Sequence, residues 1–189
     1  MGFQPGPRRG NVWDDVKTID KIISDTNFAR TLKNERGFEN LFMSTLDARK
    51  KEIKGKIHSQ LDKDTSVRSV HMFGKRHRPD LTINEDGIGI EIKFLSNRLD
   101  GLKQAIGQSI IYRVRYRFVV NVLVVDEQNK EVYAKACNDE EKDLEDICLE
   151  LSKDMNIFTY LVPAFSVDRG MKKVLDWNDV DKENTTENS

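Results

Sequence analysis

The feature that most constrains the fold is the almost wholly apolar run Phe118–Val125, with the sequence FVVNVLVV. Valine dominates this run, and β-branched residues favour a strand over a helix. A strand without polar alternation is typical of the centre of an α/β sheet, where both faces are covered by other elements. The sequence therefore predicts an α/β domain with this run near the middle of its sheet.

A β-hairpin is predicted upstream of this strand. Residues Pro79–Ile83 read as an extended segment, and proline suits the first residue of a strand. The turn Asn84–Gly87 ends in Asp-Gly, a strong hairpin signal. In Ile88–Leu95 every second residue is isoleucine or phenylalanine, so these side chains share one face of the strand. We therefore expect two antiparallel strands with one face on the core.

The hairpin would bring three charged side chains together on its other face. Asp80 would lie near Glu91 and Lys93, giving two carboxylates and one ammonium. Two hard oxygen ligands suit Mg²⁺, which keeps its other positions for water and substrate phosphate. Such an ion polarises a phosphoryl oxygen and generates hydroxide at neutral pH. The pattern thus favours phosphodiester hydrolysis, with Lys93 adding a charge beside the phosphate.

A second interpretation of the same residues needs no chemistry. Asp, Glu, Lys and Arg make up 33% of the chain, so short charged patterns also arise by chance. Under this interpretation Glu91 and Lys93 are an ordinary pair on the surface of a small-molecule or structural α/β protein. The flanking segments decide between the two.

Periodicity predicts an ordered series of further elements. Apolar spacing indicates helices and strands on both sides of the hairpin. They are helices from Val12 to about 24–26 and from about 33–37 to about 61, a strand over 66–73, a basic turn over 74–78, a helix over about 100–114, an edge strand over 131–136, a helix over 138–154 and a strand over 157–162.

Two of these helices carry polar candidates for the site. In the second helix Glu35 and Glu39 fall on or beside the apolar stripe, where a carboxylate costs desolvation unless it is paired or bound to metal. In the helix after the hairpin Gln104 and Gln108 share one face, and Tyr112 continues the row. A glutamine can orient water or bond to phosphate, and it is equally at home on an exposed helix.

Composition bounds the partners and the compartment. The 189 residues suit one domain, and the net charge of −1 provides no global basic field for a polyanion. Nucleic-acid binding would depend on local clusters: Arg76 and Arg78 before the hairpin, and Arg113, Arg115 and Arg117 after the following helix. Two cysteines without a CxxC pattern suggest a reduced, intracellular (cytoplasmic) protein. No apolar run reaches membrane-spanning length, so we expect no membrane partner.

The domain plan follows from these segments. We expect a flexible arm over 1–11, a single domain over 12–167 and a polar tail over 168–189. Within the domain, the core is expected over 33–126 and a strand-helix-strand extension over 131–167.

The order of elements resembles the restriction endonuclease-like superfamily, the PD-(D/E)xK nucleases, over about half the chain. Pro79-Asp80 and Glu91-Ile92-Lys93 correspond to its motif, and its core is an α-β-β-β-α-β arrangement around a mixed sheet. Gly37-Phe38-Glu39 is similar to the start of the Holliday-junction resolvase branch, and the glutamine-bearing helix to RecB-type branches. The resemblance leaves the branch open.

The resemblance implies roles for the hairpin residues. Asp80 and Glu91 match the metal-ligating acidic pair, and the Ile92 carbonyl would complete the metal shell. Lys93 matches the lysine that supports the attacking water and the developing charge. The implied function is that of a Mg²⁺-dependent DNA endonuclease or exonuclease, with Mn²⁺ able to substitute, which leaves 5′-phosphate ends during repair, recombination, restriction or defence.

It also implies roles for the two helices. Glu39 matches the helical acid that holds a second metal or a metal-bound water, with Glu35 competing for that role. Gln108, or Gln104, matches the auxiliary helix residue. DNA contacts are expected from Arg76, Arg78, Gln104, Tyr112, Arg113, Arg115 and Arg117. A homodimer would suit cleavage of two strands. The alternative that shares this fold is a nucleic-acid-binding subunit without turnover.

Overall fold

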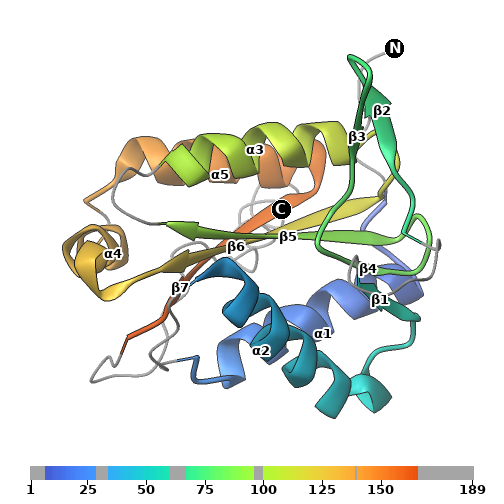
Figure 1. Cartoon of the computed structure of the whole chain (residues 1–189), viewed down its shortest axis with the longest axis horizontal. Coiled ribbons are helices and arrows are strands. Elements are labelled where there is room, and N and C mark those ends of the chain that lie inside the picture. Colours follow the sequence, from blue (N-terminus) through green and yellow to red (C-terminus); the bar gives the residue numbers. More distant parts are fainter. Residues whose placement is uncertain (1–6, 29–33, 60–66, 96–99, 139, 166–189) are drawn as a thin grey trace, which may run out of the picture.

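The chain forms a mixed β-sheet with helices on both faces (Figure 1). The structure is a computed structural model, which describes residues 7–28, 34–59, 67–95, 100–138 and 140–165. The helices are α1 (Asn11–Asp25), α2 (Glu35–Ala48), η1 (Lys50–Glu52), α3 (Asp100–Tyr112), η2 (Glu127–Asn129), α4 (Lys130–Cys137) and α5 (Lys142–Met155). The strands are β1 (Ile57–Ser59), β2 (Val70–Met72), β3 (Lys75–His77), β4 (Leu81–Ile83), β5 (Ile88–Leu95), β6 (Phe118–Val125) and β7 (Ile157–Pro163). No helix within these ranges combines the length and apolar character needed to cross a membrane.

The main sheet confirms the predicted α/β class. Its strand order is β1-β4-β5-β6-β7, with antiparallel pairing as far as β5 and parallel pairing from β5 to β7. All of Phe118–Val125 is buried as β6, between two parallel neighbours. Parallel strands need crossover connections, and these are α3 before β6 and α4 with α5 before β7. The apolar run therefore lies inside the sheet, as its composition predicts.

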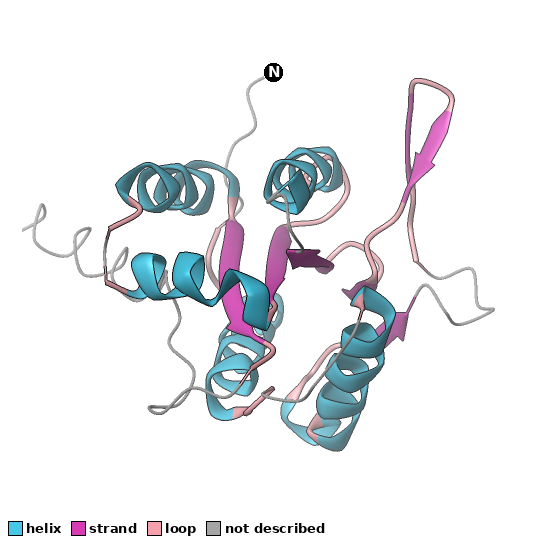
Figure 2. Cartoon of the chain, turned by 60° about the vertical axis from the view of Figure 1, so that its left-hand side comes forward, coloured by secondary structure: helices cyan, strands magenta, loops and turns pink. Residues whose placement is uncertain are grey.

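Each face of the sheet is covered by its own helices (Figure 2). Ile88, Ile90 and Ile92 belong to the core that also contains buried residues of α1 and α2. Leu95 belongs to a separate core on the other face, with Ala105 of α3. The alternation predicted for β5 is confirmed, and Glu91 and Lys93 project from the same side of the strand as Leu95.

The backbone conformation of the hairpin turn explains two of its residues. Asn84 adopts φ 58°, a left-handed conformation that asparagine tolerates. At Gly87 an added Cβ would lie 2.5 Å from the Ile83 carbonyl oxygen, so only glycine fits. β4 then pairs antiparallel with β5, Leu81 opposite Ile90. The predicted hairpin is confirmed.

The predicted helix to residue 61 is too long, because α2 ends at Ala48. Its apolar spacing continues through Ile53 and Ile57, but the chain turns instead of extending the helix. The buried Asp15 carboxylate accepts the amides of Lys54 and Gly55 at 2.7 and 2.9 Å, which fixes the turn. Ile57–Ser59 then becomes strand β1 beside β4. A contact with α1, remote in sequence, overrides the helical period.

The edge strand predicted over 131–136 is also wrong. The segment is a helix, α4, in which Tyr133 and Ala136 pack one turn apart on the core. The extension is therefore helical up to β7 and is not strand-helix-strand.

The predicted arm over 1–11 is described only from residue 7, and the predicted tail over 168–189 lies outside the described residues. In the described part of the arm, Arg8 Nη2 donates to the Ser152 carbonyl of α5 at 2.6 Å, and α1 begins at Asn11.

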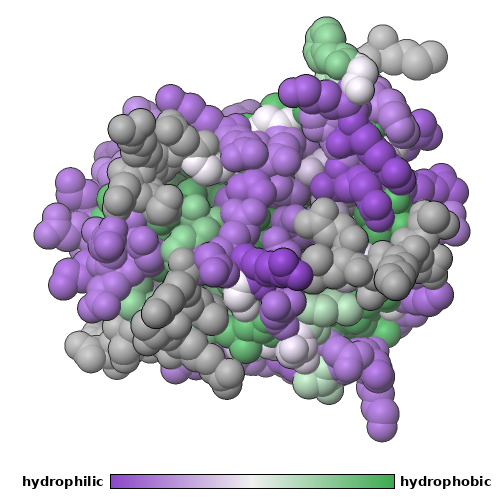
Figure 3. Space-filling view, in the orientation of Figure 1, coloured by the Kyte–Doolittle hydropathy of each residue, from purple (hydrophilic) through white to green (hydrophobic). Residues whose placement is uncertain are grey.

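A second, two-stranded sheet projects from the body of the domain (Figures 1 and 2). We call it the wing, residues Val70–His77, in which β2 pairs antiparallel with β3. The turn predicted over 74–78 is instead mostly strand, because Phe73 and Gly74 form the turn with φ 50° and 71°. The surface over β2 and β3 is strongly hydrophilic (Figure 3).

Arg113, which the sequence predicts to contact DNA, is committed to contacts within the domain. It is 8% exposed and donates Nε to the Met155 carbonyl and Nη1 to the Tyr116 carbonyl. Burial lowers the pKa of its guanidinium. The side chain joins the end of α3 to the end of α5, so its hydrogen bonds have a structural role.

We expect Arg113→Met to lower the free energy of unfolding by about 1–3 kcal/mol, because it leaves two buried carbonyls without a donor. Methionine retains much of the apolar stem, so the decrease in the free energy of unfolding reflects the loss of the hydrogen bonds. The exposed neighbour Arg115, changed to Met, is the matched control and should stay within about 0.5 kcal/mol of wild type. Urea denaturation measures both, and equal midpoints for the two variants would contradict the assignment.

Candidate active site

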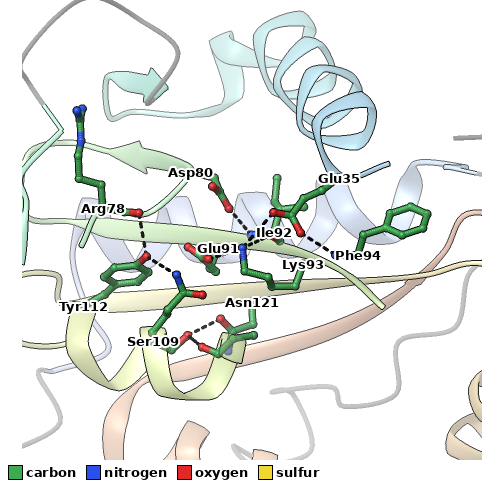
Figure 4. Close-up of polar contacts among 12 residues, drawn as sticks. Glu35, Arg78, Asp80, Glu91, Ile92, Lys93, Phe94, Ser109, Tyr112 and Asn121 are labelled. Carbon is green, nitrogen blue, oxygen red and sulfur yellow. Dashed lines mark hydrogen bonds and ion pairs between the residues drawn. The ribbon is translucent and has the colours of Figure 1, made fainter. Parts of the chain in front are cut away.

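The hairpin register brings Asp80 and Glu91 together (Figure 4). Leu81 is paired with Ile90, so Asp80 lies opposite Glu91 on the adjacent strand. Asp80 Oδ2 accepts the Ile92 amide at 2.7 Å, which orients the carboxylate. Asp80 is 6% exposed and Glu91 is 1% exposed. Two carboxylates are thus held in the interior, where such groups need partners.

The site occupies an edge of β5 that β4 does not cover. β4 pairs only with Ile88–Ile90, and the amides further along are taken by side chains. Asp80 accepts from Ile92, and Glu35 Oε2 accepts from Phe94 at 3.1 Å. The N–H and C=O of one strand residue point to the same edge, so the Ile92 carbonyl lies on this edge as well.

Lys93 connects the oxygens along this edge. Its Nζ lies 2.8 Å from Glu91 Oε1, 3.1 Å from Glu35 Oε1 and 3.2 Å from the Ile92 carbonyl oxygen. Burial by itself lowers the pKa of Lys93, but the charge and hydrogen bond of Glu91, with Asp80 and Glu35, outweigh it. The net result raises the pKa of Lys93 above its ordinary value. The side chain is therefore an ammonium surrounded by oxygen atoms.

The two buried carboxylates destabilise each other's charged form. Burial is the largest cause that raises the pKa of Asp80 to about 8, and repulsion by Glu91 adds to it. Burial also raises the pKa of Glu91, against the opposing charge of Lys93. Glu91 Oε2 is buried and has no hydrogen-bond partner among the described residues. With both carboxylates ionised, the pair would carry more negative charge than Lys93 neutralises.

The helical acid that contacts the site is Glu35. It reaches both Lys93 and the Phe94 amide, as given above. Glu39 lies one turn further along α2, and burial followed by repulsion from Glu35 raises its pKa. Its charge also raises the pKa of Asp80. Both acids face the site, but only Glu35 contacts Lys93 directly. The geometry therefore favours Glu35 over Glu39 for the role of the helical acid.

The α3 side chains differ in exposure: Tyr112 is buried, Gln108 is half-buried and Gln104 is exposed. Tyr112 donates to the Arg78 carbonyl at 2.8 Å, and its complete burial leaves no exposed surface for the predicted contact with DNA. The same hydroxyl lowers the pKa of Glu91. Gln108 Nε2 lies 3.5 Å from that hydroxyl, and its Oε1 is buried without a described partner.

The remaining arginines do not form one cluster. Arg76 is exposed on β3 and Arg115 is exposed beyond α3. Arg78 points away from Asp80 and Glu91 (Figure 4). Arg117 Nη2 donates to the Pro7 carbonyl at 3.3 Å, so it faces the N-terminal segment. Of the arginines predicted to contact DNA, Arg76 and Arg115 are therefore the most accessible to a phosphate.

A buried polar row beside Glu91 was not anticipated. Asn121 of β6 is in register with Glu91 and with Thr159 of β7. Asn121 Nδ2 donates to Thr159 Oγ1 at 3.4 Å, and the Ser109 hydroxyl contacts the Asn121 side-chain oxygen. The sequence contains a signal for it, since Asn121 is the single polar residue of the β6 run. Its position beside Glu91 depends on strand register.

The geometry overturns one interpretation. Glu91 and Lys93 are both buried, so they are not a surface pair.

Among the described residues, no three His, Cys, Asp or Glu side chains form a group that could hold one metal ion. Asp80 and Glu91 could supply oxygen ligands together with the Ile92 carbonyl, and Mg²⁺ commonly binds through one or two carboxylates and water.

Comparison with known proteins found no matching family model, curated protein or solved structure. The functional argument therefore depends on the residues and their geometry.

Proposed function

We propose that the chain is a Mg²⁺-dependent DNA nuclease of the PD-(D/E)xK type. The observation that carries the proposal is the buried group formed by Asp80, Glu91 and Lys93, in which two carboxylates lie beside one ammonium. Excess negative charge in the interior is costly, and a bound cation is a common reason for it.

The order of elements supports the same proposal. Leaving out the wing, the chain runs α2-β1-β4-β5-α3-β6, which agrees with the α-β-β-β-α-β core expected for that superfamily. The candidate residues then fall where the resemblance expects them, at the start of β4 and on β5. The specific topology is part of the proposal.

The donor set fits a hard cation. The oxygens are those of Asp80, Glu91 and the Ile92 carbonyl, without nitrogen or sulfur ligands, and Mg²⁺ and Mn²⁺ prefer such oxygens. The pKa values of both carboxylates are raised, and a second positive charge beside them would lower these values. When bound, the ion would polarise a phosphoryl oxygen and lower the pKa of a coordinated water.

The protein residues supply the remaining chemistry. Hydrolysis adds water across the P–O3′ bond, so a proton reaches the 3′ oxygen and the phosphate stays on the 5′ side. The ammonium of Lys93 would stabilise negative charge that develops on the phosphate. Glu35 positions that ammonium, and the Ile92 amide positions Asp80. DNA would approach through exposed basic residues such as Arg76 and Arg115.

Cleavage of a supercoiled plasmid tests the proposal. Wild type should nick or linearise it with Mg²⁺ or Mn²⁺ and not with EDTA. Asp80→Asn, purified in the same way, should be inactive, while the exposed Asp47→Asn should match wild type. Equal cleavage by wild type and Asp80→Asn would point to a contaminant and overturn the assignment of this site.

Cation binding should also stabilise the fold. At a Mn²⁺ concentration about 100 times Kd, a ligand that binds only the folded state adds about 2.7 kcal/mol. For a chain of this size that corresponds to a Tm increase of about 5–10 °C. Thermal unfolding at about pH 8 measures it, where the Asp80 carboxyl begins to ionise. Asp80→Asn should show at most a small increase, and an equal increase in both proteins would place the ion elsewhere.

A further inference from the structure

We propose that the wing presents Phe73 to the bases of DNA and that the substrate is a branched or distorted duplex whose base stacking is already broken. This inference rests on the proposed function for the choice of DNA. In it, the phenyl ring stacks on an unstacked base near the scissile phosphate.

Phe73 is unusually placed for an aromatic residue. It is 96% exposed, whereas the next most exposed large apolar residue among those described, Val114, is 52% exposed. It also adopts φ 50°, which is uncommon for a bulky side chain. The ring therefore adds nothing to the core while its backbone is strained, a combination that points to a binding role.

The segment that carries the ring is basic. Residues 67–78 contain Arg68, Lys75, Arg76 and Arg78 and no Asp or Glu, which is a formal charge of +4 with histidine neutral, whereas the whole chain has a net charge of −1. Arg68 is paired with Glu85 at 2.6 Å, while Lys75 and Arg76 are exposed on β3. Exposed basic residues on the same segment as an exposed aromatic ring are the usual combination for binding unstacked bases.

The residues that flank the wing on both sides accept hydrogen bonds from side chains at and just beyond the C-terminal end of α3. Tyr112 donates to the Arg78 carbonyl at 2.8 Å, and Tyr116 donates to the Arg68 carbonyl at 2.7 Å. Both tyrosines are buried, and burial raises the pKa of Tyr116 to about 12. Arg78 is followed directly by Pro79-Asp80. The base of the wing is therefore held in a defined position relative to the carboxylates.

The reach of the wing limits where the contact falls. Phe73 precedes Asp80 by 80 − 73 = 7 residues. An extended chain spans about 3.3 Å per residue, so the ring lies within about 23 Å of Asp80. Successive phosphates of one strand are about 3.4 Å apart along the helix axis. The contacted base should therefore lie within about seven nucleotides of the scissile phosphate.

Binding of 2-aminopurine-labelled DNA tests the inference. The two probes are a synthetic four-way junction, labelled in turn at positions around the branch, and an unbranched duplex of the same base composition. All proteins carry Asp80→Asn so that the DNA stays intact. Phe73→Ala should weaken junction binding about 5- to 150-fold and remove the fluorescence change at the contacted position. Phe73→Trp should retain both, and the exposed Val114→Ala is the matched control.

The outcomes separate this inference from the proposed function. If Phe73→Ala binds the junction as Val114→Ala does, the wing inference is overturned, whether or not wild type cleaves DNA. If Phe73→Ala loses affinity equally for the junction and the duplex, the assignment to branched substrates is overturned. If wild type fails to cleave but junction binding depends on Phe73, the nuclease proposal fails and the wing inference stands.

Discussion

Lys93→Met is expected to lower the rate of DNA cleavage by about 10²–10⁴-fold. Lys93 has the only described ammonium in contact with Glu91, and its Nζ lies 2.8 Å from that carboxylate. Methionine keeps an unbranched apolar stem of similar length but removes the positive charge. The loss should therefore fall on the chemical step and leave DNA affinity within about tenfold of wild type.

Single-turnover cleavage with saturating Mn²⁺ measures the effect, and a gel shift with EDTA measures affinity. The exposed Lys50→Met is the matched control and should cleave as wild type does. Because Lys93→Met leaves a buried carboxylate with less compensation, circular dichroism must show that the variant is folded. Folded Lys93→Met that cleaves at the wild-type rate would remove Lys93 from the mechanism.

Glu35→Gln provides a milder test of the same group. It keeps an oxygen that can accept the Phe94 amide but removes the charge beside Lys93. A positioning residue of this kind should reduce cleavage less than loss of Lys93 does. Single-turnover cleavage under the same conditions measures the effect, and a wild-type rate for Glu35→Gln would remove Glu35 from the mechanism.

The second large effect is an unusual dependence of stability on pH. Without divalent cations, the free energy of unfolding should fall as pH rises from about 4 to about 8. Asp80 has its ordinary pKa near 3.8 in the unfolded chain and a pKa of about 8 in the folded protein. Between these values the folded state binds more protons than the unfolded state, so raising the pH favours unfolding. Most surface carboxylates behave in the opposite way.

Asp80→Asn should remove most of this dependence. Asparagine still accepts the Ile92 amide but carries no charge, so at about pH 8 the variant should be more stable than wild type by on the order of 5 kcal/mol. At about pH 4 the two should be similar. Urea denaturation in EDTA across this range is the measurement. The exposed Asp47→Asn should follow wild type throughout.

Added Mn²⁺ should reverse the order of the two proteins at about pH 8, because only wild type retains both carboxylates. A wild-type stability that stays level or rises across the window in EDTA would contradict the burial argument. An unchanged order with Mn²⁺ would contradict the cation site alone, so the two ideas can fail separately.

Local signals predict the centre of the fold well. The Asp-Gly turn, the alternation of Ile88–Leu95 and the valine-rich run of β6 each depend on neighbours in the chain. They place Asp80 beside Glu91 without further information. The wrong predictions involve contacts between remote segments. Helix α2 stops where Asp15 binds the amides beyond it, and α4 is a helix because it lies in the connection between parallel strands.

The candidate site shows the same division. Asp80, Glu91 and Lys93 were found from the period of a strand and the length of a turn, which are properties of a short stretch of sequence. The tertiary structure decided that Glu35 contacts Lys93. It also turned Tyr112 and Arg113 inward, although their sequence positions favoured DNA contact. The physical reason is that the periodicity of a strand or helix gives the direction of each side chain. The burial and the partners of that side chain depend on which distant element packs against it.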